Sequence, residues 1–111
     1  RTKDMIISGG FNIYPRDVED ALMAHHAVAS AAVIGIPDDK WGEAVAAFVA
    51  LRAGQRADDA ALIGFAKDRL AGYKVPKSVP FIDEVPKSPV GKLLRRAVRD
   101  PFWKGRERRI G

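Results

Sequence analysis

Two apolar runs separated by a short turn constrain the fold of this chain most strongly. Residues 28–36 are rich in small and β-branched side chains, and the Pro-Asp-Asp sequence of residues 37–39 that follows is typical of a turn. Residues 43–51 (EAVAAFVAL) form a second run between two glycines. The alanine content of this second run is also compatible with a helix. Its flanking glycines and its place after a strand favour an antiparallel hairpin.

Shorter patterns predict the elements on either side of this hairpin. Apolar residues at helical spacing indicate helices, and short apolar runs that end at glycine or proline indicate strands. The further predicted elements are strands at residues 5–8, 11–14 and 79–82, and helices at residues 16–23, 58–70 and 92–98, the last one stopped by Pro101. The sequence therefore predicts an α+β domain, with a small sheet of about three strands plus a short hairpin, covered by helices.

The composition suits one small domain with an anionic partner. The chain has 111 residues, a formal net charge of +5 and a sequence pI of about 9.8. This excess of positive charge favours nucleic acid, a phosphorylated small molecule or a membrane surface as the partner. The absence of cysteine excludes disulfides and thiolate metal sites.

The N-terminal sequence and the apolar runs bear on localisation. No apolar run approaches the roughly 20 residues that a membrane-spanning helix requires, and no signal-like stretch follows the first four residues (RTKD). We therefore expect a soluble cytoplasmic protein. Because no initiator methionine precedes Arg1, we also expect residues 1–111 to be a domain cut from a longer chain.

The loop at residues 86–92 (PKSPVGK) is the strongest candidate for chemistry. Two prolines and a glycine restrict its backbone, and Lys92 is expected at the start of the last helix. An ammonium group at a helix N-terminus suggests a phosphate or carboxylate ligand that binds both. The pattern is equally compatible with a stiff surface loop that carries a solvated lysine. It is not a P-loop, because Pro86 and Leu93 replace the required glycine and the required serine or threonine.

Gly9-Gly10 is the second candidate, at the bend between the first two predicted strands. Without side chains at the bend, a ligand can approach the backbone closely, although an ordinary tight turn has the same pattern. The adjacent His25 and His26 would point in different directions on a helix, so they do not suggest a shared metal ion.

Longer motifs make the chain recognisable. Residues 1–15 (RTKDMIISGGFNIYP), with Val18-Glu19 after them, resemble the hinge and the following motif of the AMP-forming acyl-CoA synthetase family. Residues 86–96 (PKSPVGKLLRR) resemble the C-terminal lysine motif of that family. Shorter matches lie between them, in the same order as in the family: IPD at residues 36–38, WGE at residues 41–43 and YKVP at residues 73–76.

The resemblance extends to particular branches of this superfamily, which also includes peptide-synthetase adenylation domains and luciferases. The stretch at residues 7–15 looks more like acyl- or aryl-CoA synthetases, and residues 99–103 are similar to the tails of fatty-acid-CoA ligases. The resemblance implies that residues 1–111 are the small, mobile C-terminal domain of such an enzyme, beginning at its hinge. ATP, AMP and Mg²⁺ would be bound mainly by a large N-terminal domain that these residues lack, so the chain alone is expected to be inactive.

The resemblance also implies roles for individual residues. The family activates a carboxylic acid with ATP to an acyl-adenylate, and then transfers the acyl group to coenzyme A. Lys92 matches the adenylating lysine, and Lys3 matches the hinge position. Arg1 matches an arginine near the nucleotide, while Gly9 and Gly10 match the loop that lines the pantetheine tunnel after the domain rotates.

For four further cationic side chains, two roles each are compatible with the sequence. Lys74 is compatible with contact to a phosphate of coenzyme A and equally with a solvated side chain. Arg95, Arg96 and Arg99 are expected on a mostly exposed helix face, where a solubilising or domain-interface patch is favoured over contact with coenzyme A.

The implied role of Lys92 agrees with the chemistry of adenylation. A carboxylate must attack the α-phosphate, so two anions must meet, and an ammonium group between them acts as an electrostatic stabiliser rather than a base. The same charge has no task in thiol transfer. The spacing from Pro86 to Gly91-Lys92 also resembles the pattern that protein acetyltransferases recognise in this family, and acetylation would remove the charge.

The main alternative from another class is a basic nucleic-acid-binding or interaction module. Eight lysine or arginine residues lie between Lys92 and Arg109. The aromatic residues there are only Phe102 and Trp103, and no RRM, KH or OB signature is present. The ligase interpretation is therefore preferred.

Overall fold

The predicted hairpin is the centre of the fold in the computed structural model, which describes residues 4–104. Strands β3 (Val28–Asp38) and β4 (Gly42–Leu51) pair antiparallel along nearly their whole length, with one register shift between Val28 and Ser30. The Asp38 carboxylate closes the turn by accepting hydrogen bonds from the N–H groups of Lys40 and Trp41, both at 2.9 Å. The hairpin prediction is confirmed.

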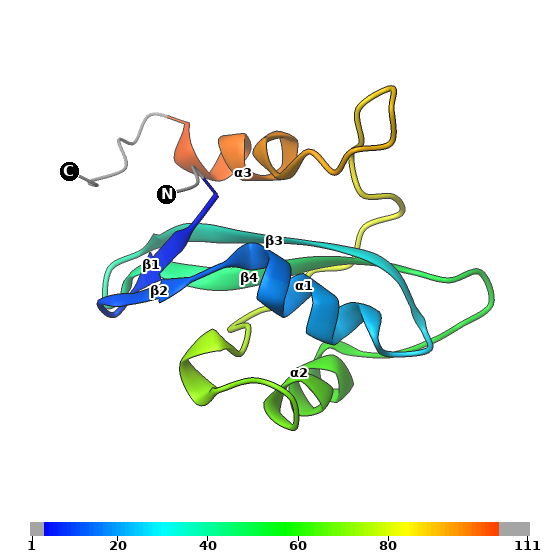
Figure 1. Cartoon of the computed structure of the whole chain (residues 1–111), viewed down its shortest axis with the longest axis horizontal. Helices are drawn as coiled ribbons and strands as arrows, with labels where there is room; N and C mark the ends of the chain where they lie inside the picture. The colour runs from blue at the N-terminus through cyan, green and yellow to red at the C-terminus, as the bar shows by residue number, and fades with distance from the viewer. Residues whose placement is uncertain (1–3, 105–111) are drawn as a thin grey trace.

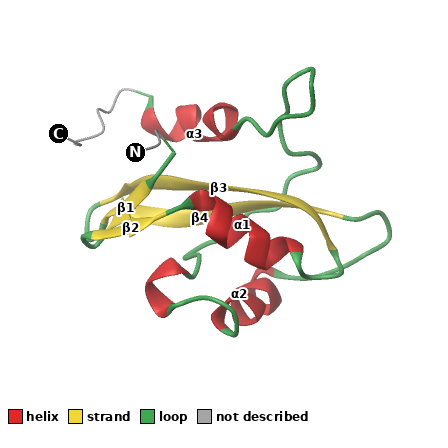
Figure 2. Cartoon of the chain, viewed as in Figure 1, coloured by secondary structure: helices red, strands yellow, loops and turns green. Residues whose placement is uncertain are grey.

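Helices cover both faces of this hairpin (Figures 1 and 2). Helices α1 (Pro15–Met23) and α2 (Asp59–Lys67) pack on the face that holds Ala31 and Val33, and α3 (Arg95–Trp103) packs on the face that holds Ala32 and Ile34. Because successive side chains of β3 alternate between two buried layers, the strand is a continuous apolar run rather than an alternating one.

Two smaller β elements complete the predicted α+β arrangement. Strands β1 (Ile6–Ser8) and β2 (Phe11–Ile13) form the short hairpin, as expected. Residues 77–82 run parallel to β4 and exchange backbone hydrogen bonds with it, but only as isolated bridges. The predicted strand at residues 79–82 is therefore interrupted, because Pro80 has no N–H group to continue the ladder.

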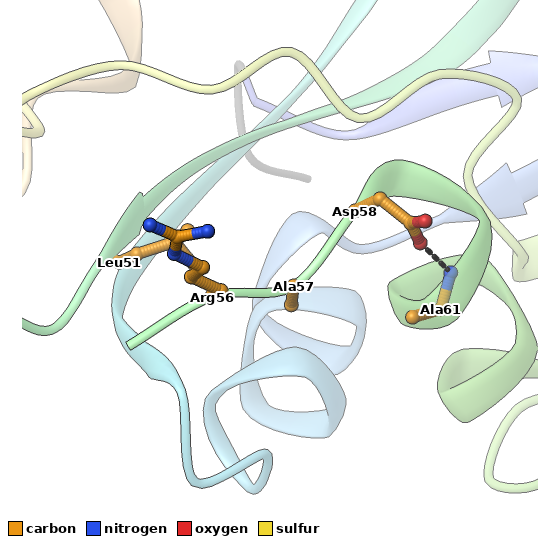
Figure 3. A pocket seen from close by; sticks show the side chains of 5 residues that line it. All are labelled: Leu51, Arg56, Ala57, Asp58 and Ala61. Carbon is orange, nitrogen blue, oxygen red and sulfur yellow. Dashed lines mark hydrogen bonds between the residues drawn. The ribbon is translucent and has the colours of Figure 1, made fainter. Parts of the chain in front are cut away.

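The first two helices begin where their sequence signals place them. Pro15 occupies the first turn of α1, and the Asp58 side chain caps α2 by accepting a hydrogen bond from the Ala61 N–H at 2.8 Å (Figure 3). Helix α2 ends at Lys67, three residues before the predicted end, because the N–H groups of Arg69 and Leu70 both bond to the Ala66 carbonyl in a closing turn. A short 3-10 helix, η1 (Gly72–Lys74), follows.

The last helix differs most from its prediction. It begins at Arg95 instead of residue 92, because the Leu94 N–H bonds to the Pro86 carbonyl at 3.0 Å and keeps the preceding residues extended. Pro101 lies in its last turn and does not stop it. The Trp103 indole N–H donates to the Gly35 carbonyl at 2.8 Å and holds the end of α3 on β3. Within residues 4–104, no helix is long and apolar enough to cross a membrane.

Candidate functional site

The Lys92 loop, defined here as residues 86–94, is a small hairpin that projects from the domain and closes on itself (Figure 1). Besides the Leu94–Pro86 bond, the Gly91 N–H donates to the Ser88 carbonyl at 2.8 Å, which makes a tight turn at the tip. Gly91 has a φ of 83°, a conformation that favours glycine. Val90, at the tip, is 89% exposed. The loop therefore takes its shape from its own hydrogen bonds.

Both backbone polar groups of Lys92 are bonded to Ser88. The Lys92 N–H donates to the Ser88 Oγ at 3.1 Å, and the Lys92 carbonyl accepts from the Ser88 N–H at 2.8 Å. These bonds orient the residue while its side chain stays exposed. The expectation that Lys92 starts a helix is wrong, since α3 begins three residues later. The loop, rather than a helix N-terminus, positions the ammonium group.

A groove with a volume of about 410 Å³ lies between the Lys92 loop and α1. Its lining brings together four cationic side chains and two carboxylates: Arg16, Lys87, Lys92, Arg95, Glu19 and Asp20. One of these carboxylates, Asp20, pairs with Arg16 at 3.6 Å. Because cations outnumber carboxylates, the groove suits an anionic ligand.

In the lining of this groove, Arg95 joins three segments in what we call the Arg95 network. Its guanidinium donates to both carboxylate oxygens of Glu19, at 2.7 and 2.6 Å, and to the Asp4 carboxylate at 3.1 Å. Glu19 also accepts the Val33 N–H at 2.9 Å. The hydrogen bonds to Glu19 raise the pKa of Arg95 above its ordinary value, against the opposing effect of burial.

The network corrects one expectation from the sequence and buries a carboxylate that the sequence reasoning missed. Arg95 and Arg99 do not lie on an exposed face, because only 19% and 20% of their side chains are accessible, whereas Arg96 is 84% accessible as predicted. Glu19, a carboxylate within the helix predicted at residues 16–23, is only 3% exposed. The sequence did carry a signal: Glu19 falls on the same helix stripe as the buried Pro15, Val18 and Leu22.

The Gly9-Gly10 turn joins β1 to β2. Both glycines have positive φ angles, 57° and 85°, as a two-residue hairpin turn of type I′ requires. The Gly9 N–H donates to the Trp41 carbonyl at 2.9 Å. A Cβ atom at Gly9 would lie 2.8 Å from the Trp41 ring, so the indole occupies the space that any side chain would need.

Trp41 is the residue of this region that the sequence reasoning missed. The residue is 39% exposed, and the ammonium groups of Lys40 and Lys77 lie 4.9 and 5.3 Å from the ring centroid. The signal was present in the WGE motif directly after the Asp38 turn. The Gly9-Gly10 turn is therefore bordered by an aromatic ring and two positive charges.

The remaining predicted site residues have different outcomes. Lys74 lies 3.4 Å from the Asp17 carboxylate on α1 and is 25% accessible, so it is paired within the domain rather than freely solvated. Arg1 and Lys3 lie outside the residues that the structure describes. In the described part of the chain, no three histidine, aspartate or glutamate side chains are arranged to hold a metal ion.

The structure does not bring the two glycine-containing loops together. The Gly9-Gly10 turn and the Lys92 loop lie at opposite ends of the domain, with the hairpin of β3 and β4 between them (Figure 1). A small ligand bound at one of them is therefore out of reach of the other.

Comparisons with known proteins agree with this architecture. The family model for the AMP-binding enzyme C-terminal domain matches residues 17–92. A long-chain-fatty-acid–CoA ligase of Bacillus subtilis (strain 168) is 55% identical over 96 residues, which cover 86% of this chain and 17% of the relative. A feruloyl-CoA synthase of an Amycolatopsis species is 51% identical over 102 residues, which cover 92% of this chain and 21% of the relative.

The solved structures give the same picture. A fatty acyl CoA synthetase of Mycobacterium tuberculosis superposes with a TM-score of 0.85 at 39% identity, over 96% of this chain and 21% of that chain. The chain thus spans about a fifth of the length of the curated relatives it matches.

Proposed function

The chain belongs to the AMP-binding enzyme C-terminal domain family, and from this membership we propose that it is the mobile C-terminal domain of an acid–CoA ligase. The complete enzyme would activate a carboxylic acid with ATP to acyl-AMP, and would then form the acyl-CoA thioester. The observation that carries the proposal is Lys92, presented on a self-closed, exposed loop beside a groove with excess positive charge.

A fatty acid is the proposed substrate, because a long-chain-fatty-acid–CoA ligase shares more than half of the aligned residues. A feruloyl-CoA synthase is almost as similar. Similar domains therefore occur in enzymes with differently named products, which is expected if residues outside this domain select the acid. The two glycine loops described here are suited to steps that every such acid shares.

Lys92 would serve the first of these steps. In adenylation, its ammonium group would lie between the attacking carboxylate and the α-phosphate, and would stabilise the charge that develops there. The hydrogen bonds to Ser88 hold its backbone before any ligand arrives, so less ordering is needed at the moment of reaction. ATP supplies the adenylyl group, and Mg²⁺ would be held mainly by the domain that these residues lack.

The Gly9-Gly10 turn would serve the second step. A turn without side chains, bordered by Trp41 and two lysines, allows the narrow pantetheine arm of coenzyme A to pass close to the backbone. Because this turn and Lys92 lie at opposite ends of the domain, they would act in turn through rotation about Lys3. Arg1 would lie near the nucleotide, and Lys74 would be available to coenzyme A only by leaving Asp17.

The test separates the two half-reactions in the complete enzyme. Lys92→Ala should slow acyl-adenylate formation, measured by ATP–pyrophosphate exchange, by about 10²–10³-fold. Thioester formation from supplied acyl-adenylate should stay within about twofold, since the ammonium group has no role there. Equal losses in both half-reactions would contradict the assignment.

A matched control tests position rather than charge. Lys87→Ala removes the same charge from the same groove and should slow adenylation by less than about tenfold, because an exposed charge at a distance is screened by water. Lys3→Pro should restrict the hinge and impair one half-reaction more than the other. If that variant runs both at normal rates, Lys3 is not the hinge.

We further propose that a protein acetyltransferase regulates the enzyme at Lys92. The side chain is exposed on a projecting loop, as a modifying enzyme requires, and acetylation would remove the charge that adenylation uses. Mass spectrometry of the native protein across growth conditions tests this, and Lys92 unmodified in all of them would count against it.

A further inference from the structure

The Arg95 network joins residues that are far apart in the sequence. Arg95 lies 91 residues after Asp4 and 76 residues after Glu19, yet its side chain contacts both. Asp4 begins the described chain and directly follows the proposed hinge residue, and Arg95 is the first residue of α3, just beyond the Lys92 loop. The network thus connects Asp4, the first described residue, to the residue that directly follows the Lys92 loop.

The two arms of this network differ in kind. The Glu19 arm is bidentate and buried, with 4% of the Glu19 side chain accessible, and it also satisfies the Val33 N–H. Removing it would leave the Arg95 guanidinium, which is only 19% accessible, with Asp4 as its one described partner and would leave the Val33 N–H without its acceptor, which is strongly destabilising. The Asp4 arm is one contact at 3.1 Å, with 40% of the Asp4 side chain accessible.

The Asp4 arm adds little to the fold. An ion pair of this exposure typically contributes little to stability, because water screens its charges. It does, however, tie down the residue next to the hinge. We propose that the Arg95 network couples the hinge to the Lys92 loop, so that Asp4 marks where the hinge ends and Arg95 is a positioning residue for Lys92.

The contacts supply a route for this coupling. The Asp4 carboxylate holds the guanidinium of Arg95, and the backbone runs from Arg95 through Leu94, whose N–H is bonded within the Lys92 loop. Leu93 packs in the layer under α3. These contacts form a continuous path from Asp4, next to the proposed hinge residue, to the base of the Lys92 loop. This inference rests on the proposed function of Lys92 and Lys3.

Asp4→Asn in the complete enzyme is the informative variant, because it keeps the shape of the side chain and leaves the Glu19 arm intact. We expect adenylation to slow by about three- to fivefold, because one partly exposed contact is lost while the Glu19 arm still holds Arg95. Thioester formation from supplied acyl-adenylate should change by less than about twofold, and the unfolding midpoint should stay unchanged. Equal slowing of both half-reactions, or no slowing of either, overturns the proposal.

A double variant separates positioning from an independent effect. If Asp4 acts through Lys92, then Asp4→Asn should cause less than about a twofold further loss of adenylation in the Lys92→Ala enzyme. A further loss of about three- to fivefold there would mean that Asp4 acts without Lys92, and the proposal fails. Failure of the proposed function itself looks different, because Lys92→Ala alone would then spare adenylation.

Arg95→Lys and Arg96→Lys form a matched pair on the same helix. Lysine keeps the charge at residue 95 but cannot donate to Glu19 and Asp4 in the same geometry, so adenylation should slow by about fivefold or more. Arg96 is exposed, with Asp100 3.8 Å away, and its replacement should leave both half-reactions unchanged. Equal behaviour of the two variants overturns the positioning role.

Discussion

The two glycine-containing loops are held in opposite ways. The Gly9-Gly10 turn depends on a distant residue, since Trp41 accepts the Gly9 N–H and its ring lies against the turn. The Lys92 loop depends on its own residues, with Ser88 bonded to both ends of Lys92 and Leu94 bonded to Pro86. One loop is part of the packed domain, and the other projects from it.

This difference predicts how each loop responds to substitution. A change in the Gly9-Gly10 turn disturbs contacts with Trp41 and should lower the stability of the whole domain. A change in the Lys92 loop breaks hydrogen bonds within the loop only. It should therefore affect adenylation without changing the free energy of global unfolding. One small domain can therefore carry a Gly9-Gly10 turn that is fixed by packing and a Lys92 loop that is held by its own hydrogen bonds.

Gly9→Ala, compared with Gly10→Ala, is the strongest test. Both positions have positive φ, which costs alanine about 1–2 kcal/mol. Only at Gly9 would the new methyl group also meet the Trp41 ring, 2.8 Å away, so Gly9→Ala should lower the free energy of unfolding by about 3 kcal/mol. Urea unfolding of this chain measures both losses. Equal losses would show that Trp41 does not hold the turn.

A Trp41→Ala background sharpens this comparison. Without the indole, the methyl group at residue 9 has space, so the extra cost of Gly9→Ala over Gly10→Ala should disappear. A cost that persists in that background would point to the backbone conformation alone.

Ser88→Ala tests the local character of the Lys92 loop. It removes the side-chain acceptor of the Lys92 N–H, a loss of about 1 kcal/mol that is confined to the loop. Adenylation should therefore slow by about fivefold, while the free energy of unfolding changes by less than about 0.5 kcal/mol. Ser78→Ala, beside β4, is the control and should leave adenylation unchanged. A large drop in global stability for Ser88→Ala would contradict the local interpretation.

The smallest expected effect is a pH dependence of the stability of the whole domain, which should affect both loops equally. His25, after α1, accepts the Ala27 N–H at Nδ1, at 3.0 Å. Its pKa is lowered chiefly by burial, and further by the positive charges of His26 and Arg69. The unfolded chain therefore binds the proton more readily, so stability should be highest above about pH 6.5 and should decrease as the pH falls below that value.

Urea unfolding at pH 7.5 and 5.5 checks this direction. His25→Gln should reduce the difference between the two pH values. An unchanged difference in that variant would assign the effect to other groups.

The parts of the fold that could be predicted are those encoded by contiguous residues. The apolar runs at residues 28–36 and 43–51 revealed the hairpin, and Gly9-Gly10 revealed the turn between β1 and β2. The start of α3 could not be predicted from helical spacing, because Leu94 bonds back to Pro86 and this local pairing prevails over the periodicity.

The parts of the site that were missed depend on partners distant in sequence. Trp41 covers Gly9 from 32 positions away, and no pattern within either segment specifies that contact. Arg95 looked solvated because its helix neighbours are polar, whereas Glu19 and Asp4 come from the first part of the chain. Lys92 was found because its loop is continuous, although its position relative to the helix was wrong.

The bond from the Val33 N–H to Glu19 also bears on how copies of this chain behave toward one another. Strand β3 is an edge of its two-stranded sheet, and free N–H groups along such an edge can pair with a strand of another molecule. The Glu19 carboxylate accepts a hydrogen bond from one of these groups, the Val33 N–H, and α1 packs along the same strand. The buried carboxylate therefore opposes aggregation, and replacing Glu19 should first reduce the fraction of soluble protein during expression.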